Sequence, residues 1–173
     1  MKHFKLAFII AFLILSACKT KKTATSNWTM DSCIELAVDS SDYIRAYGNG
    51  TSFKESMAKR ESLLKARYNI CYIIKKATIE AIKGQKNGDS IPPYLNGIMN
   101  PPCFLLKTNV YDLSNGMCQV YCCLQTKITK EKLCNNIIDS LNSNGCTTID
   151  KNLFVKNFFE EIEKSKKMME KQL

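Results

Sequence analysis

The sequence predicts an α+β domain, in which a small antiparallel sheet of about three strands is covered on one face by a long helix. Two further helices are expected at the C-terminus. Three observations predict this fold: a long segment of helical periodicity without proline, two strand-like runs that flank an Asn-Gly turn, and two helical segments after them. This order of elements is typical of an antiparallel sheet with its helices gathered on one side.

The long helix is expected from Phe53 to Lys83. Small and apolar residues recur there at spacings of three or four, which places them on one helical face: Ala58, Ser62, Ala66, Ile70 and Ile74. The residues in the first turns are small and those in the later turns are larger. We therefore expect the N-terminal half of the helix to lie close against the sheet.

The residues before this helix predict a short helix and a strand. Asp31–Val38 is expected to be helical, with Asp31 as its N-cap. Tyr43–Gly48 alternates as a strand does, and Gly48-Asn-Gly50 predicts a turn that ends the strand.

After the long helix, Cys103–Asp112 and Met117–Thr126 are predicted to form a hairpin around the turn Leu113-Ser-Asn-Gly116. A helix capped by Thr129 should follow, to about Leu141. The last helix, from about Asp150, is expected to bury four side chains and to end in a polar tail. These are Leu153, Phe154, Phe158 and Ile162.

The N-terminus has the pattern of an export signal. Lys2 and Lys5 precede ten apolar residues, Leu6–Leu15, which are too few to cross a bilayer. Small residues follow, as in a cleaved signal peptide. Leu15-Ser-Ala-Cys18 resembles the lipobox of bacterial lipoproteins at all four positions. The resemblance implies cleavage before Cys18 and fatty acylation, including palmitate, of the new N-terminus.

Three segments follow from this resemblance. Residues 1–17 are expected to be a lipoprotein signal peptide, residues 18–30 a lipidated Cys18 with a flexible tether, and residues 31–173 a single α+β domain. The expected location is the cell outer membrane, on its periplasmic or surface face, and the membrane itself is the first expected partner. Loss of Lys2 and Lys5 lowers the formal charge from +9 to +7, and a tethered exported protein of this charge is not expected to bind nucleic acid.

The chain is not expected to be an enzyme. Its single histidine, His3, lies in the signal segment, which excludes Ser-His-Asp and Cys-His catalysis and zinc bound through histidine from the mature chain. No catalytic residue, cofactor or metal ligand is predicted.

Besides Cys18, the chain has eight cysteines, which either form disulfide bridges or remain free thiols. They are Cys33, Cys71, Cys103, Cys118, Cys122, Cys123, Cys134 and Cys146. Cys118, Cys122 and Cys123 could suggest a metal site. On a strand, however, Cys118 and Cys122 would share a face about 13 Å apart and Cys123 would point to the other face, so a shared metal is not expected.

A family resemblance adds to these predictions. Ala46-Tyr-Gly48-Asn-Gly50, the small residues Ala58 and Ser62, the pair Ala66-Arg67 and the strand Val120–Leu124 resemble small bacterial lipoproteins of the LPP type. Their domain is similar to the N-terminal domain of the flagellar assembly protein FlgT. The resemblance covers about Tyr43 to Leu141. It implies a lipid-anchored envelope protein with no catalytic residues to transfer.

Two functions are therefore weighed. The first is a non-enzymatic lipoprotein of the cell envelope that acts through contacts with an envelope protein still to be identified. The alternative is a module that binds a glycan or peptide on the sheet face that carries Tyr121.

Overall fold

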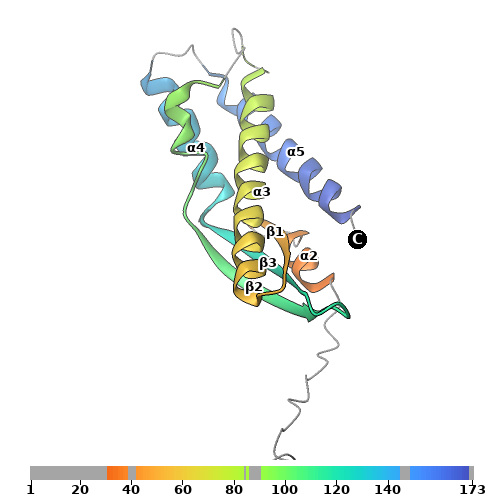
Figure 1. Ribbon diagram of the computed structural model, residues 1–173. Helices are drawn as coiled ribbons and strands as arrows, with labels where there is room; N and C mark the ends of the chain where they lie inside the picture. Colours follow the sequence, from red (N-terminus) through yellow and green to blue (C-terminus); the bar gives the residue numbers. More distant parts are fainter. Residues whose placement is uncertain (1–30, 39–41, 84, 86–90, 145–148, 172–173) are drawn as a thin grey trace, which may run out of the picture.

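The computed structural model describes residues 31–38, 42–83, 85, 91–144 and 149–171. The predicted α+β architecture is confirmed: a three-stranded antiparallel sheet, a long helix on one of its faces and two C-terminal helices (Figure 1). The predicted signal segment, residues 1–17, and the tether, residues 18–30, lie outside the described residues.

The sheet has the order β1-β3-β2, so the last strand in the sequence is the central one. Its strands are β1 (Tyr43–Ser52), β2 (Cys103–Asp112) and β3 (Cys118–Thr129). Gly48 pairs with Cys122 and Asn109 pairs with Tyr121, and all neighbours are antiparallel. The long helix α3 (Glu55–Lys83) covers one face, and the short helix α2 (Asp31–Val38) packs on the other face (Figure 1).

The prediction that Gly48-Asn-Gly50 ends the first strand is wrong. β1 continues through both glycines to Ser52, and both glycines lie under α3. A Cβ atom at Gly48 would collide with the backbone of Ser62 and Ala66, and one at Gly50 would collide with the carbonyl of Ala58. The glycines therefore permit a close approach of helix and strand instead of forming a turn.

The small residues of α3 complete this close contact, as the sequence predicted. Ala58, Ser62 and Ala66 are fully buried against the sheet. The Ser62 hydroxyl donates a hydrogen bond of 2.9 Å to the carbonyl of Gly48. The Asn69 amide donates one, also of 2.9 Å, to the carbonyl of Tyr47. Two side chains of the helix thus hold β1 by its backbone.

The predicted turn and caps are confirmed where the structure describes them. The hairpin turn contains Gly116 at φ +77°, a conformation that glycine adopts easily. The Thr129 hydroxyl accepts from the Lys132 amide at 3.2 Å and starts α4 (Lys130–Ser143). Asp150 accepts from the Leu153 amide at 3.1 Å and starts α5 (Lys151–Glu170). The side chain of Asp31, the other predicted cap, lies outside the described atoms.

The main core lies where the C-terminal half of α3 meets α4 and α5. Ile70, Ile74, Leu133, Phe154 and Phe158 are buried there. The short helix η1 (Pro93–Asn96) adds Leu95 to the same core.

The prediction for α5 is partly wrong. Phe154, Phe158 and Ile162 are buried, but Leu153 is 36% exposed because it precedes their row by one residue and points away from it. The C-terminal half of the helix is not a solvated tail: Glu161, Ser165 and Lys166 are all buried. It packs along α3 (Figure 1), which the polar composition of this segment concealed.

Candidate functional site

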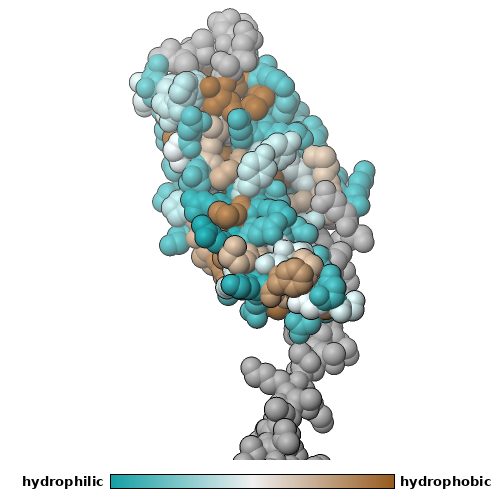
Figure 2. All heavy atoms as spheres, viewed as in Figure 1, coloured by the Kyte–Doolittle hydropathy of each residue, from teal (hydrophilic) through white to brown (hydrophobic). Residues whose placement is uncertain are grey.

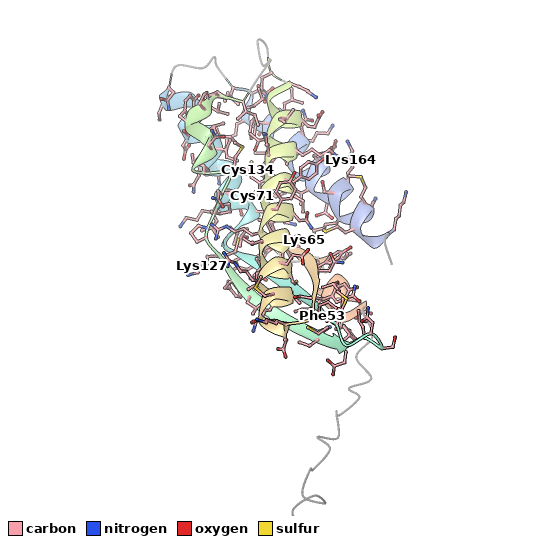
Figure 3. All side chains as sticks on the ribbon, in the orientation of Figure 1. Phe53, Lys65, Cys71, Lys127, Cys134 and Lys164 are labelled. Carbon is pink, nitrogen blue, oxygen red and sulfur yellow. The ribbon has the colours of Figure 1, made fainter. Side chains whose placement is uncertain are left out.

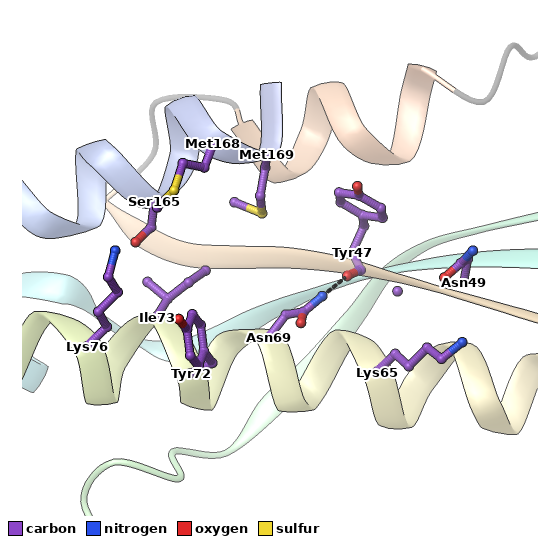
Figure 4. Close-up of a pocket in the computed structure, with 11 residues that line it drawn as sticks. Tyr47, Asn49, Lys65, Asn69, Tyr72, Ile73, Lys76, Ser165, Met168 and Met169 are labelled. Carbon is purple, nitrogen blue, oxygen red and sulfur yellow. Dashed lines mark hydrogen bonds between the residues drawn. The ribbon is translucent and has the colours of Figure 1, made fainter. Parts of the chain in front are cut away.

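A pocket of about 390 Å³ lies at the free edge of β1, between α3 and α5 (Figure 4). Its lining residues come from these three elements, and they are Tyr47, Gly48, Asn49, Lys65, Asn69, Tyr72, Ile73, Lys76, Ser165, Met168 and Met169. Its volume is within the range of small-ligand sites, about 300–1,000 Å³.

Helical spacing explains why α3 contributes so many of these side chains. Asn69, Ile73 and Lys76 recur at intervals of four and three, which places them on one side of the helix. Ser165 and Met169 on α5 are four residues apart and face them across the pocket (Figure 4). The pocket therefore depends on the packing of α5 against α3.

Two lysines, one toward each end of the pocket, are held by ion pairs (Figure 4). The Lys76 ammonium lies 2.5 Å from the buried carboxylate of Glu161, which Lys164 also approaches at 3.6 Å. The hydrogen bond that Lys76 donates to the Glu161 carboxylate raises the pKa of Lys76 above its ordinary value. Lys65 pairs with Glu61 at 2.7 Å on the surface of α3. At neutral pH, Lys76 is thus a fixed cation at the wall of the pocket.

One buried hydroxyl in the pocket lacks a partner. The Oγ atom of Ser165 has no hydrogen-bond partner among the described residues, although the side chain is only 6% exposed. A buried polar group of this kind costs about 1–3 kcal/mol if it stays unpaired. Bound water or a ligand hydroxyl in the pocket would satisfy it.

The lining combines protonated polar groups with an apolar wall. Burial raises the pKa of Tyr47 above its ordinary value, so its phenol stays protonated at neutral pH. Lys76 is protonated as well, and Met168 and Met169 supply an apolar wall. These groups can hold a ligand by hydrogen bonds and apolar contact.

The structure separates the residues that the sequence singled out. Cys118 and Cys122 share the α3 side of the sheet, while Cys123 packs against Cys33 of α2 on the other side, as predicted for a strand. The seven cysteines that the structure describes are free thiols. Cys18 and Cys146 lie outside the described residues. No three His, Cys, Asp or Glu side chains gather into a possible metal site within the described ranges.

The buried thiols are poor nucleophiles. Burial raises the pKa of Cys33 to about 11 and those of Cys123 and Cys134 to about 12. Because the thiolate is the reactive form, these cysteines stay unreactive near neutral pH.

The sheet face that was expected to bind a ligand is covered. Tyr121 is 6% exposed, because α2 packs over it and Tyr111 contacts its ring edge-on at 5.8 Å. Arg67, from the Ala66-Arg67 pair of the family resemblance, donates to the amide oxygen of Asn100 at 3.1 and 3.3 Å.

The pocket itself was not predicted. Its residues converge from segments more than 100 positions apart, and neither tyrosines nor serines in those segments follow a recognisable motif. The serine on the polar half of α5 would have indicated a pocket only if the packing of that helix had already been known.

Comparison with protein families, with curated proteins and with solved structures finds no match to this chain. The resemblance to LPP-type lipoproteins and to the FlgT domain therefore stays a prediction. Among the helices of the described residues, none has the length and apolar character to span a membrane.

Proposed function

We propose that this chain is a lipoprotein of the bacterial cell envelope, fastened to the outer membrane by acyl chains on Cys18. Its domain acts through contacts with another envelope protein and not through catalysis. The observation that carries this proposal is Leu15-Ser-Ala-Cys18, placed directly after ten apolar residues and a lysine-containing N-terminus. Several acyl chains anchor stably, since each buried CH₂ contributes about 0.8 kcal/mol.

The domain is consistent with a part suspended from such an anchor. The described residues between 31 and 171 contain a three-stranded sheet and a hydrophobic core. The high thiol pKa values and the protonated groups of the pocket favour a binding role over nucleophilic or base catalysis.

The anchor is tested by metabolic labelling of bacteria that express the full chain with radioactive palmitate. The wild-type protein should be labelled, and the mass of the mature protein should correspond to a chain that begins at Cys18. Cys18→Ala should carry no label and should leave the membrane fraction. Cys71→Ala, which removes a half-buried thiol of the domain, is the matched control and should be labelled as wild type. Equal labelling of Cys18→Ala would refute the anchor.

The partner is sought in the same cells by chemical cross-linking before solubilisation. The lipidated wild-type chain should retain an envelope protein that the unanchored Cys18→Ala chain retains less well. Recovery of the same proteins with both chains would contradict a role that depends on attachment to the membrane.

A second candidate function is favoured by the unpartnered Ser165 hydroxyl: a module that binds a glycan or peptide in the pocket between α3 and α5. The Tyr72 ring, 53% exposed, stands at the pocket with Tyr68 stacked beside it at 6.4 Å. Exposed aromatic rings of this kind suit a sugar ring or a peptide side chain.

Thermal shift with envelope glycans and short peptides tests this candidate. A true ligand should raise the melting temperature of wild type and of Ser56→Ala, an exposed serine outside the pocket. Ser165→Ala should lose most of that increase. Flat thermal shifts across the set, or an equal increase in Ser165→Ala, would reject the pocket as the binding site.

A further inference from the structure

The outward side of α3 carries an unusual row of exposed apolar and aromatic side chains, called here the α3 face. It consists of Phe53, Met57, Leu64, Tyr68 and Tyr72, which are 74%, 53%, 61%, 68% and 53% exposed. Phe53 stands just before the helix at its N-terminal end (Figure 3). Contiguous exposed apolar residues mark interaction sites more often than isolated ones do.

The spacing places these side chains on one side of the helix, where Glu61, paired with Lys65 at 2.7 Å, lies between Met57 and Leu64. Met57, Leu64, Tyr68 and Tyr72 are separated by seven, four and four residues, which returns each to the same side of a helix with 3.6 residues per turn. The buried residues Ala66 and Ile70 fall on the opposite side, against the sheet and core. In Figure 2, apolar patches are interspersed with polar residues over the front of the molecule, where Figure 1 places α3.

The charge on this helix is strongly positive. α3 contains seven basic and three acidic residues. Arg60 lies one turn from both Met57 and Leu64, and Lys75 lies one turn beyond Tyr72, so both cations accompany the apolar row. Both are exposed. Aromatic rings with adjacent cations match the interface of an anionic bilayer, where rings sit at headgroup level and Lys or Arg meet phosphate.

The position of the predicted anchor makes this contact reachable. The described chain begins with α2 at the same end of the molecule at which α3 starts (Figure 1). Ser32 in α2 is fixed there by a 2.7 Å hydrogen bond from Asn109, close to the hairpin end of the sheet. The chain from Cys18 to Asp31 spans at most about 45 Å when extended. That length exceeds the roughly 10 Å between packed layers that it would have to pass.

The geometry points to the α3 face as a surface that lies on the anionic headgroups of the membrane to which the chain is anchored. This inference rests on the proposed lipid anchor. A second copy of the chain is a poor occupant, because two such helices face to face would bring their excess positive charges together. Contact with the membrane through α3 leaves α2, which covers the opposite face of the sheet, available to an envelope partner.

The test uses the lipidated chain, purified and reconstituted into vesicles that contain lipids brominated on their acyl chains. Trp28, the single tryptophan, is replaced by Phe, and Tyr68→Trp places a reporter on the α3 face. Leu153→Trp, on α5 and off this face, is the matched control. The vesicles are phosphatidylglycerol with phosphatidylcholine in equal parts, or phosphatidylcholine alone. Circular dichroism confirms that each variant is folded.

We expect the tryptophan at position 68 to be quenched, with a blue-shifted emission, on the phosphatidylglycerol vesicles. The quenching should weaken on phosphatidylcholine, at high salt and in the variant that also carries Arg60→Gln and Lys75→Gln. The tryptophan at position 153 should not be quenched. Flotation with phosphatidylcholine vesicles tests the anchor separately: a chain without its lipid anchor should no longer float with these vesicles.

Three results would overturn the inference. The first is an unquenched tryptophan at position 68 on phosphatidylglycerol vesicles. The second is equal quenching at position 153, which would show contact without a preferred face. The third is a photo-cross-linker at position 68 that captures a second copy of the chain or an acidic envelope protein in place of lipid.

Discussion

Replacement of Gly48 by alanine tests the contact between β1 and α3 directly. In the native structure, the Gly48 Cα lies under the helix backbone, and a Cβ atom there would be 2.9 Å from the carbonyl carbon of Lys65 and would collide with Ser62 and Ala66. All of these are main-chain atoms, so no side-chain rotation can relieve the contact. α3 must move away from the strand or β1 must bend.

The expected loss of stability follows from three contributions. Overpacking costs about 1–3 kcal/mol in general, and a rigid backbone neighbour places this case near 3 kcal/mol. Displacement of the helix also weakens the 2.9 Å bond from Ser62 to Gly48, for about 1 kcal/mol. The lower entropy of alanine in the unfolded chain returns about 0.4–1 kcal/mol. The net loss should be about 3 kcal/mol, or about 6–12 °C in melting temperature for a domain of this size.

Urea unfolding of the wild-type and variant domains, followed by far-UV circular dichroism, measures this loss. Gly97→Ala is the matched control, because Gly97 has a helical φ of −64° and a Cβ there would meet nothing within 4 Å. We expect Gly97→Ala to be neutral or slightly stabilising. A Gly48→Ala domain within about 0.5 kcal/mol of wild type, the usual range of surface substitutions, would refute the close-packing argument.

Three further predictions concern the core, the buried ion pair and the thiols. Phe158→Ala should lower the free energy of unfolding by about 3–5 kcal/mol, since its side chain is fully buried. Lys76→Met should cost about 3 kcal/mol in the same urea assay, because it leaves the buried Glu161 carboxylate without its nearest cation; the exposed pair of Lys83 is the control, and Lys83→Met should cost under about 1 kcal/mol. Stability should be unaffected by the Cys123 thiol below pH 9 and should fall as the pH rises above 9, because the unfolded thiol ionises there while the folded one, with a pKa of about 12, does not. Cys123→Ala should show a smaller fall between pH 9 and pH 11 when urea midpoints are compared.

Each of these has a result that would contradict it. A Phe158→Ala domain as stable as wild type would mean that α5 does not hold the core. Equal losses of stability in Lys76→Met and Lys83→Met would contradict the burial of the Glu161 carboxylate. The same alkaline decline in wild type and Cys123→Ala would assign that decline to other groups.

The sequence revealed the elements whose signals are local. The periodicity of α3, the Asn115-Gly116 turn and the capping residue Thr129 are properties of short segments, and the structure confirms them. Even the close packing of the first half of α3 was predictable, because Ala58 and Ala66 are too small to hold a neighbour away.

What the sequence concealed depends on contacts between distant segments. The sequence around Gly48 reads the same whether the glycine forms a turn or lies under a helix. Only the position of α3 distinguishes these two roles. The polar end of α5 is another case. Glu161 is buried because Lys76, 85 positions earlier, neutralises it, and the pocket beside Ser165 exists only through that packing.

The strand order has a consequence for how the chain becomes folded. β1 ends at Ser52, and the strand that it pairs with in the described sheet, β3, begins at Cys118. At about 5–20 residues per second, β3 follows β1 from the ribosome by several seconds, and pairing across this separation is intrinsically slow. A helix that forms from local contacts fills the interval. The newly made N-terminal strand therefore has an unsatisfied backbone edge, and a holding chaperone has time to recognise it before the central strand arrives.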